Sequence, residues 1–382
     1  MSSIFPRITT LIITTTNECN LECVYCHNRP FLNSFFKKPI HLKYNDFKKI
    51  CREYCNYLTL KGYPVGEFCF SGGEPLLLGP KYYEKFFTIQ KKIFGRKKIK
   101  ITNLFQTNGT LVDEKWIKFF KKYDVKIGIS IDGTRDNQNK TRPFKNQGKT
   151  FQSINHTIFL LKRNNIRFGF LCVVSRYNMN NAKRIMDFFI SSQPESIAFI
   201  PCLDYSGKIK DKEYGKFLVQ SFDRWVELKR YDIPVRNFKF VLHALLGIKN
   251  LDLPCENAGR CPCNININLN GDMFICDIFM GKKEGYLGNI KEISLLEIEK
   301  MVHYLQVRKR ILSLPAKCKK CKFLEICNGG CFYRRISRKN NLDYLCKANL
   351  EIFNHIANYL KSNSNLAKVI EKKIPSGLNS GT

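Results

Sequence analysis

Three cysteines close to the N-terminus have the spacing of metal ligands. Cys19, Cys23 and Cys26 form a C-x3-C-x2-C pattern in the segment CNLECVYC. A structural zinc site prefers four ligands, whereas three thiolates on one loop suit a [4Fe–4S] cluster with one iron left open. Buried free thiols are the alternative, and we interpret the adjacent His27 as a loop residue rather than a fourth ligand. The pattern therefore predicts iron–sulfur chemistry.

A second group of cysteines lies in the C-terminal third of the chain. Its members are Cys255, Cys261, Cys263, Cys276, Cys318, Cys321, Cys327, Cys331 and Cys346. Paired cysteines at short spacing are also typical of zinc ribbons, so zinc is the alternative to further clusters. The chain has 17 cysteines, an odd number, and the pattern of a signal peptide is missing at residues 1–20. These features favour metal or redox chemistry over disulfides.

Short turns with glycine follow three of the expected strands. They are SGGEP at 71–75, QTNGT at 106–110 and the segment SIDG at 130–133. Each alone would be ordinary turn chemistry. Because loops after parallel strands share one face of a barrel, we expect these turns and the first cysteine loop to converge on one site.

The apolar periodicity predicts strands that alternate with helices. Strands are expected at 8–15, 66–70, 99–105, 125–131, 167–174 and 196–201, and helices near 44–60, 80–94, 113–122, 151–165 and 180–192. Such units build a parallel sheet, so the expected fold class is α/β with a partial (β/α)6 barrel. We expect a core domain at 1–225, a cysteine-rich domain at 226–361 and a flexible tail at 362–382. The cysteine-rich part should contain short strands around 264–276.

The composition describes a basic globular chain. Of 382 residues, 44% are hydrophobic and 13% aromatic, which excludes a disordered or fibrous protein. Lys and Arg number 64 against 32 Asp and Glu, giving a net charge of +32. Nucleic acid, an acidic peptide or anionic cofactors would each suit this charge. No apolar stretch reaches the roughly 18 residues of a membrane span, so we expect a cytoplasmic protein without a membrane partner.

The cysteine and glycine motifs together resemble those of a known family. CNLECVYC is similar to the cluster motif of radical S-adenosylmethionine (SAM) enzymes, and SGGEP to their SAM-amine motif. In that family the open iron chelates SAM, which is cleaved to methionine and a 5′-deoxyadenosyl radical. The resemblance implies that Cys19, Cys23 and Cys26 hold this cluster. It assigns SAM contacts to Tyr25 (adenine), to Gly72, Gly73 and Glu74 (amine), and to Ser130 and Arg142 (carboxylate). Ser71 stands where close relatives often have Gln.

The second cysteine group resembles the SPASM module, which carries two auxiliary [4Fe–4S] clusters. The resemblance rests on Cys261-x9-Gly271-x4-Cys276 and on the four-cysteine run that follows it. It implies that the first auxiliary cluster is held by Cys255, Cys261, Cys276 and Cys331, and the second by Cys318, Cys321, Cys327 and Cys346. Cys263 is then left over and could compete with Cys261. Three clusters and SAM are the cofactors expected.

Within SPASM proteins, the chain is most similar to anaerobic sulfatase-maturating enzymes, over approximately 8–360. The similarity includes QTNGTLVDEKW, SIDG and GDMFICD. Such enzymes oxidise Ser or Cys of a target protein to formylglycine, and Asp277 matches the position proposed as their general base. The alternative for Asp277 is that it only accepts backbone hydrogen bonds. Implied partners are a peptide or protein substrate and a low-potential electron donor such as flavodoxin or ferredoxin.

Other functions stay open at this point. The first alternative is a maturase of a ribosomally made peptide that installs a cross-link, thioether or epimer. The second is RNA modification, which the charge permits but no appended RNA-binding motif supports. A non-enzymatic electron carrier is disfavoured by the Gly-Glu-Pro turn beside the three-cysteine loop. Binding of SAM would distinguish an electron carrier from the enzymes.

Overall fold

A nine-stranded sheet curves through the molecule in the order β6-β5-β4-β3-β2-β1-β7-β8-β9. The computed structural model describes residues 7–203, 207–248, 255–257, 261, 263–336 and 338–363. The strands are β1 Thr10–Thr16, β2 Val65–Gly72, β3 Lys100–Thr107, β4 Lys126–Ser130, β5 Phe168–Val174, β6 Ser196–Pro201, β7 Asn264–Ile267, β8 Asp272–Phe274 and β9 Tyr286–Asn289. Strands β1 to β6 pair in parallel. Their carboxyl ends therefore lie at one edge.

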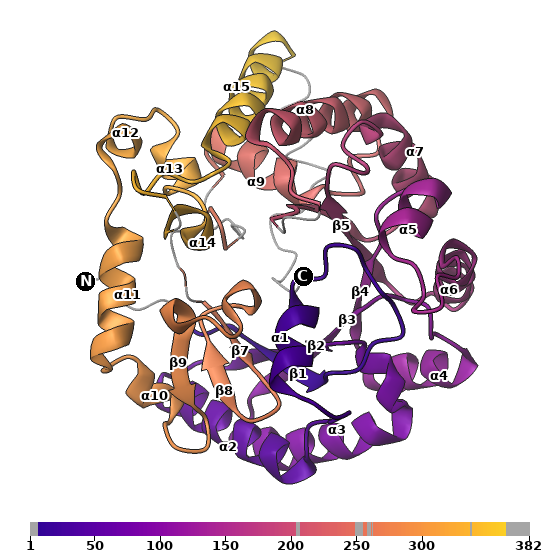
Figure 1. Ribbon diagram of the computed structural model, residues 1–382, viewed down its shortest axis with the longest axis vertical. Coiled ribbons are helices and arrows are strands. Elements are labelled where there is room, and N and C mark those ends of the chain that lie inside the picture. Colours follow the sequence, from indigo (N-terminus) through magenta and orange to yellow (C-terminus); the bar gives the residue numbers. More distant parts are fainter. Residues whose placement is uncertain are drawn as a thin grey trace.

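Helices form a ring outside the strands (Figure 1). In the barrel part they are α1 Asn28–Phe35, α2 Tyr44–Leu60, α3 Pro80–Phe94, α4 Glu114–Tyr123, α5 Arg135–Thr141, α6 Phe151–Arg163, α7 Ala182–Ser192, α8 Asp211–Glu227 and α9 Arg236–Leu245. In the cysteine-rich part they are α10 Leu295–Ile298, α11 Val302–Leu312, α12 Ala316–Lys319, α13 Leu324–Cys327, α14 Phe332–Ile336 and α15 Cys346–Ser362. Four short 3₁₀ helices, η1 Pro75–Leu78, η2 Gly95–Lys97, η3 Asp277–Phe279 and η4 Lys283–Gly285, complete the described elements.

The alternation of side chains along β2 separates the core from the barrel interior. Phe70 is fully buried and packs on Phe47 of α2, with ring centroids 6.0 Å apart. Glu67 points to the opposite face, where it accepts a hydrogen bond from Thr10 of β1 and pairs with Lys126 of β4. Apolar side chains thus pack the helices against the outer face of the sheet, and polar side chains line the barrel interior.

The cysteine-rich part continues the barrel sheet through β7. This strand pairs in parallel with β1, and Ile12 lies opposite Asn266. Strands β8 and β9 extend the sheet in antiparallel pairing. Beyond them, α10, α12 and α13 have four residues each, and α14 has five. The 17-residue α15 packs against α8, so the two parts of the chain share a core.

The α/β prediction with a partial (β/α)6 barrel is confirmed, and six expected strands occur within a few residues of their positions. The pairing of β7 with β1 was not foreseen, because parallel partners far apart in sequence leave no turn signal. The domain boundaries at 225 and 361 stay a prediction. Residues 364–382 of the expected tail lie outside the described residues. No helix in the described part is long and apolar enough to cross a membrane.

Candidate active site and cluster-binding cysteines

The first cysteine group lies on the loop after β1, at the carboxyl edge of the sheet. Cys19, Cys23 and Cys26 are partly buried, and the Leu21 N–H donates a hydrogen bond to Cys19 Sγ at 3.4 Å. Burial raises the pKa of Cys19 to about 12 and that of Cys23 to about 11. Charge on Cys26 adds to both shifts. The three sulfur atoms therefore share one small region, as ligands of one cluster must.

Two glycines let the end of β2 approach this loop closely. The Gly73 N–H donates to the carbonyl of Thr16 at 2.8 Å. A Cβ atom at Gly73 would lie 1.9 Å from the carbonyl oxygen of Glu18, the residue before Cys19. Gly72 has φ of 121° and would clash with Thr16 in the same way. Any side chain here would push the cysteine loop away from the sheet.

Glu74 holds three segments of the site together. Its carboxylate accepts hydrogen bonds from Thr107 Oγ1 at 2.6 Å, from the Asn108 N–H at 2.8 Å and from the Leu76 N–H at 3.0 Å. Asn108 in turn donates to Asn20 in the cysteine loop at 2.9 Å. Burial raises the pKa of Glu74 to about 7, although these donors oppose the shift. The SGGEP and TNG turns therefore converge, and the role of Glu74 toward SAM stays a prediction.

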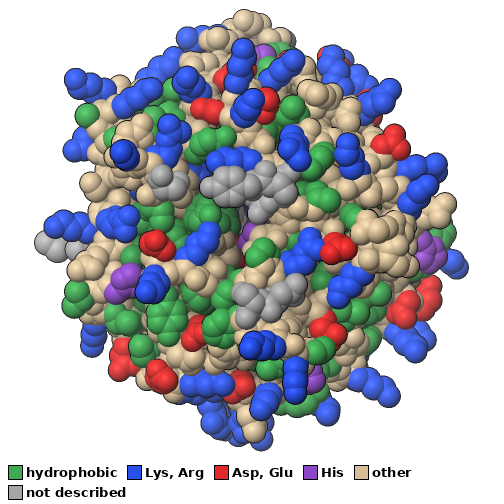
Figure 2. All heavy atoms as spheres, viewed as in Figure 1, with side chains coloured by type: hydrophobic (Ala, Val, Ile, Leu, Met, Phe, Trp, Pro, Cys, Tyr) green, Lys and Arg blue, Asp and Glu red, His purple; other side chains and the backbone are tan. Residues whose placement is uncertain are grey.

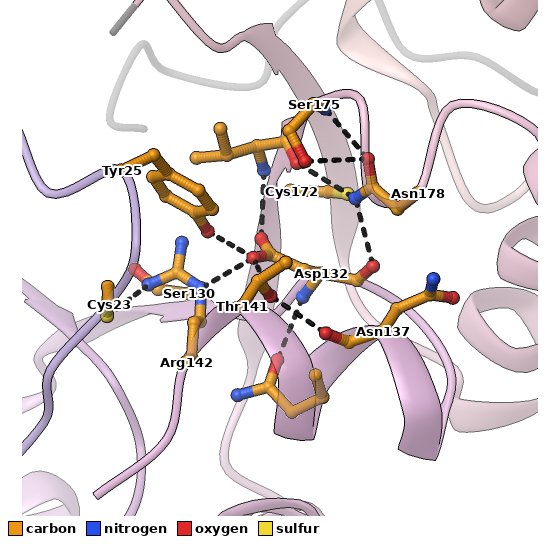
Figure 3. A network of polar contacts seen from close by, with 12 residues as sticks. Cys23, Tyr25, Ser130, Asp132, Asn137, Thr141, Arg142, Cys172, Ser175 and Asn178 are labelled. Carbon is orange, nitrogen blue, oxygen red and sulfur yellow. Dashed lines mark hydrogen bonds and ion pairs between the residues drawn. The ribbon is translucent and has the colours of Figure 1, made fainter. Parts of the chain in front are cut away.

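A buried carboxylate, Asp132, is the centre of the polar network in Figure 3. It accepts hydrogen bonds from the Tyr25 hydroxyl and, at 2.6 Å, from Thr141. Arg142 Nε lies 3.1 Å from Asp132 Oδ2, with both side chains buried. Arg142 Nη1 lies 4.0 Å from Cys23 Sγ at the other end of the guanidinium. Buried charges need partners, so Asp132 fixes Arg142 and Tyr25 next to the first cysteine group.

Ser130 ends β4, two residues before Asp132. Its hydroxyl accepts a hydrogen bond from Gln106 Nε2 at 2.9 Å. Gln106 belongs to β3, beside the turn that carries Thr107. The two residues expected at the SAM carboxylate, Ser130 and Arg142, thus lie on neighbouring segments of the same network (Figure 3).

The four cysteines expected at the first auxiliary cluster come together. Burial raises the pKa of Cys276, and the charges of Cys261, Cys331 and Cys255 add to this shift. Charge on Cys263 likewise raises the pKa of both Cys255 and Cys261. All five sulfur atoms are therefore neighbours, and the competition between Cys263 and Cys261 stays open.

The second auxiliary set also converges, on the turns of α12, α13 and the start of α15. Burial raises the pKa of Cys327 to about 12, and charge on Cys346 and Cys318 contributes. Burial likewise raises the pKa of Cys318, where Cys321 contributes. Four thiols around one region are the donor set that a [4Fe–4S] cluster takes.

Asp343 connects the two auxiliary sets. It accepts hydrogen bonds from the Cys331 N–H at 2.8 Å and the Leu345 N–H at 2.8 Å. The Arg334 guanidinium lies 2.8 Å from Asp343 Oδ1 and 2.7 Å from Glu256. Cys331 belongs to the first set, and Leu345 immediately precedes Cys346 of the second. One buried carboxylate thus positions backbone in both.

Asp277 follows Cys276 directly and faces the first cysteine loop. His27 Nε2 lies 3.6 Å from Asp277 Oδ2, and the two side chains are 49% and 42% exposed. Partial burial raises the pKa of Asp277, but the nearby His27 and the Ile278 N–H lower it by more, so this pKa lies below its usual range. The candidate base and a residue beside Cys26 therefore meet from opposite ends of the chain.

The described residues contain no group of three or more His, Cys, Asp and Glu side chains that could hold a single metal ion. Thiols are ligands of zinc and of [4Fe–4S] clusters alike, so the type of donor does not choose between these two metals.

Comparison with known proteins decides the family. A profile of the radical SAM superfamily matches residues 13–189, and one described as an iron-sulfur cluster-binding domain, SPASM, matches 255–322. A cysteine-type anaerobic sulfatase-maturating enzyme from Clostridium perfringens is 29% identical over 92% of this chain and 96% of its own. A serine-type enzyme from Bacteroides thetaiotaomicron is 30% identical over 90% of this chain and 87% of its own. The chain belongs to the anaerobic sulfatase-maturating enzyme family.

Solved structures agree with this family. Native anSMEcpe with bound AdoMet superposes with a TM-score of 0.83 at 28% identity, covering 94% of this chain and 99% of the other. Streptococcus suis SuiB bound to SAM has a TM-score of 0.62 at 18% identity, which shows a shared fold alone. This sulfatase-maturating family member is thus a radical SAM enzyme that modifies a peptide or protein. Its cofactors are [4Fe–4S] clusters and SAM.

Several residues of this family member were assigned no role from the sequence. Asp132 was visible only as part of a turn, and Asp343 lies in NNLDY without any motif. His27 was interpreted as a loop residue, yet the structure pairs it with Asp277. A cysteine spacing is recognisable within a short stretch of sequence. The roles of these three residues depend instead on burial or on partners that lie far away in the sequence.

Proposed function

We propose that this chain oxidises a cysteine or serine side chain of a sulfatase to formylglycine. The observation that carries this proposal is the similarity to a cysteine-type anaerobic sulfatase-maturating enzyme over 92% of this chain. Serine-type relatives match as well, so both side chains are candidates. The position of Asp277 at the interior face of the first cysteine loop supports the same chemistry.

The proposed ligand assignment follows the three converging thiol sets. Cys19, Cys23 and Cys26 hold the SAM-binding cluster, Cys255, Cys261, Cys276 and Cys331 the first auxiliary cluster, and Cys318, Cys321, Cys327 and Cys346 the second. Once bound, the reduced SAM-binding cluster together with SAM supplies hydrogen-atom abstraction from a carbon of the substrate. Tyr25, Gly72, Gly73, Glu74, Ser130 and Arg142 are the proposed SAM contacts.

Asp277 is the proposed general base. Its carboxylate would accept the proton of the substrate thiol or hydroxyl within hydrogen-bond reach. His27 Nε2, 3.6 Å away, holds one of the carboxylate oxygens toward the first cysteine loop. Loss of that proton makes the neighbouring substrate carbon easier to oxidise, so proton removal and oxidation take place at one position.

The test is anaerobic reconstitution with SAM and dithionite, using cysteine- and serine-containing sulfatase peptides. A new carbonyl at the target position, located by mass spectrometry, is the expected product. The variant Asp277→Asn should retain SAM cleavage and lose at least about a hundredfold in peptide oxidation, the usual share of a general base. Glu284→Gln is the matched control, because Glu284 is exposed in the same region.

Two results would contradict these assignments. Full product formation by Asp277→Asn would remove the base assignment. Modification of a leader-bearing peptide, with sulfatase peptides left unchanged, would favour the ribosomal-peptide maturase instead. A low-potential one-electron carrier such as flavodoxin or ferredoxin and a cytoplasmic location complete the proposal, since thiolate clusters need reducing surroundings.

A further inference from the structure

Five exposed lysines surround the second auxiliary cysteine set. We call them the lysine collar: Lys317, Lys319, Lys320, Lys322 and Lys347. Lys317 to Lys322 alternate with the ligands Cys318 and Cys321 on α12 and the turn after it, and Lys347 follows Cys346. Figure 2 shows Lys and Arg side chains gathered at the corner where α11, α12 and α13 lie in Figure 1.

Of the collar lysines, Lys317 is the one that acts electrostatically on Cys318 and Cys346. Lys317 is among the principal charges that act on Cys318 and Cys346 and oppose the rise of their pKa by burial. No collar lysine has a carboxylate within ion-pair distance in the described part of the chain. Exposed cations that no carboxylate neutralises create, at this density, a positive field that extends into solvent.

The adjoining surface has the mixture of groups found at transient protein interfaces. Leu312 at the end of α11 is 55% exposed, and Lys309 and Arg310 are exposed next to it. A small apolar contact inside a charged rim suits a short-lived complex, because the charges steer the encounter and the small area permits rapid release.

We propose that the lysine collar, with Leu312 at its edge, is the docking surface for a small acidic one-electron carrier protein. The inference deepens the proposed function, since it rests on Cys318, Cys321, Cys327 and Cys346 holding a cluster. Three of these cysteines are only partly buried, so a carrier on the collar lies directly over the ligands. The carrier is oxidised by one electron, the cluster beneath is reduced by one electron, and no bond forms or breaks.

A second basic surface on the same molecule provides an internal control. A groove of about 800 Å³ between α2 and α3 is lined by Lys48, Arg52, Lys92, Arg96 and Lys97 and by no acidic residue. It lies at the bottom of the ring in Figure 1, away from α12 and α13 at the upper left. Both surfaces attract anions, but only the collar adjoins a proposed cluster.

The experiment measures the binding of a flavodoxin, an acidic flavin protein, to the anaerobic holoenzyme by fluorescence titration. Lys319→Glu with Lys320→Glu should raise the Kd at least about tenfold, and Lys319→Gln with Lys320→Gln by a smaller factor. Lys48→Glu with Arg52→Glu in the groove should change the Kd less than about twofold. Raising the ionic strength should abolish the difference between wild type and the collar variant.

Oxidation of flavodoxin hydroquinone, followed by stopped flow, should slow in parallel with binding. SAM cleavage driven by dithionite should stay within about twofold of wild type, because a small-molecule reductant needs no docking surface. An unchanged Kd in the collar variant, or equal weakening by the groove variant, would overturn the proposal. Iron content distinguishes the two levels of inference, since a protein lacking the iron of the second auxiliary cluster contradicts the ligand assignment rather than the docking surface.

Discussion

The mouth of the barrel and the cysteine-rich region position their functional residues in different ways. At the mouth, each functional segment follows a strand of five to eight residues whose register is set by its neighbours. In the cysteine-rich region, most cysteines of the second set lie on or beside helices of only four residues. Helices so short have no stability of their own in water. Order there must come from ligation and from buried polar contacts.

The two regions also differ in the interactions that stabilise them. The barrel has a continuous aromatic core, in which Phe47 and Phe86 stack with centroids 3.9 Å apart. The cysteine-rich region shares in this core and adds the buried ion pair of Asp343 and Arg334 beside its short helices. Breaking such a pair costs far more than an exposed pair, because the remaining charge has no water to solvate it.

Removal of the clusters is the strongest test of this contrast. Chelation under reducing, anaerobic conditions should increase amide hydrogen exchange in 302–346 by about a hundredfold or more, because ligation free energy there is folding free energy. Amides of β2 to β5 should change less than about threefold, since their partners are other strands. Mass spectrometry of peptic fragments measures both. Equal loss of protection in the barrel would contradict the contrast.

The variant Asp343→Ala should have the next largest effect. It leaves Arg334 buried without its main partner and frees the backbone of Cys331, so we expect a loss of about 3–5 kcal/mol in the free energy of unfolding and a lower iron content. Urea unfolding and iron analysis are the measurements. Asp187→Ala, which removes an exposed partner of Arg224, is the control and should cost less than about 1 kcal/mol. An iron content equal to wild type would refute the positioning role.

Much of the barrel could be predicted from the sequence because its signals are local. Strand ends carry glycine turns and the cysteines have recognisable spacings, so the sequence alone singles out Cys19, Gly73 and Cys318, whose roles stay predictions. Pairing between β7 and β1 joins residues about 250 positions apart and has no turn or periodicity of its own.

The residues that escaped prediction share one property. Asp132 and Asp343 are fully buried acids whose importance comes from donors on other segments. A lone Asp in a turn is most often a solvated turn residue, so the sequence offers no reason to single it out. Only the fold determines whether such an Asp is buried, and a buried Asp needs hydrogen-bond donors that the sequence does not identify.

At the barrel mouth, Asp132→Asn should weaken SAM binding with the fold retained. Arg142 loses its counter-ion and Tyr25 changes its partner, so the Kd for SAM should rise about ten- to a hundredfold, equivalent to one hydrogen bond to a charged group. Equilibrium dialysis with labelled SAM measures the change. Asp136→Asn, which changes an exposed acid on the following helix α5, should leave the Kd unaltered. If both variants bind SAM like wild type, Asp132 serves only the fold.

The smallest expected effect concerns the joint between the two regions, at His243 of α9. This side chain is 2% exposed, its Nε2 has no hydrogen-bond partner, and burial, aided by Lys239, lowers its pKa from 6.5 to about 4. The folded state keeps His243 neutral while the unfolded chain takes up a proton. Its contribution is therefore complete above pH 6.5 and is lost as the pH falls toward 4.

Replacing this histidine with an apolar side chain of similar size removes that pH dependence. Between pH 6.5 and 4, the free energy of unfolding of His243→Leu should fall by about 1–2 kcal/mol less than that of wild type. Urea unfolding at several pH values measures both curves, and His156→Leu, a histidine exposed on α6, should follow wild type. Parallel curves for wild type and His243→Leu would show that protonation of His243 does not change the free energy of unfolding.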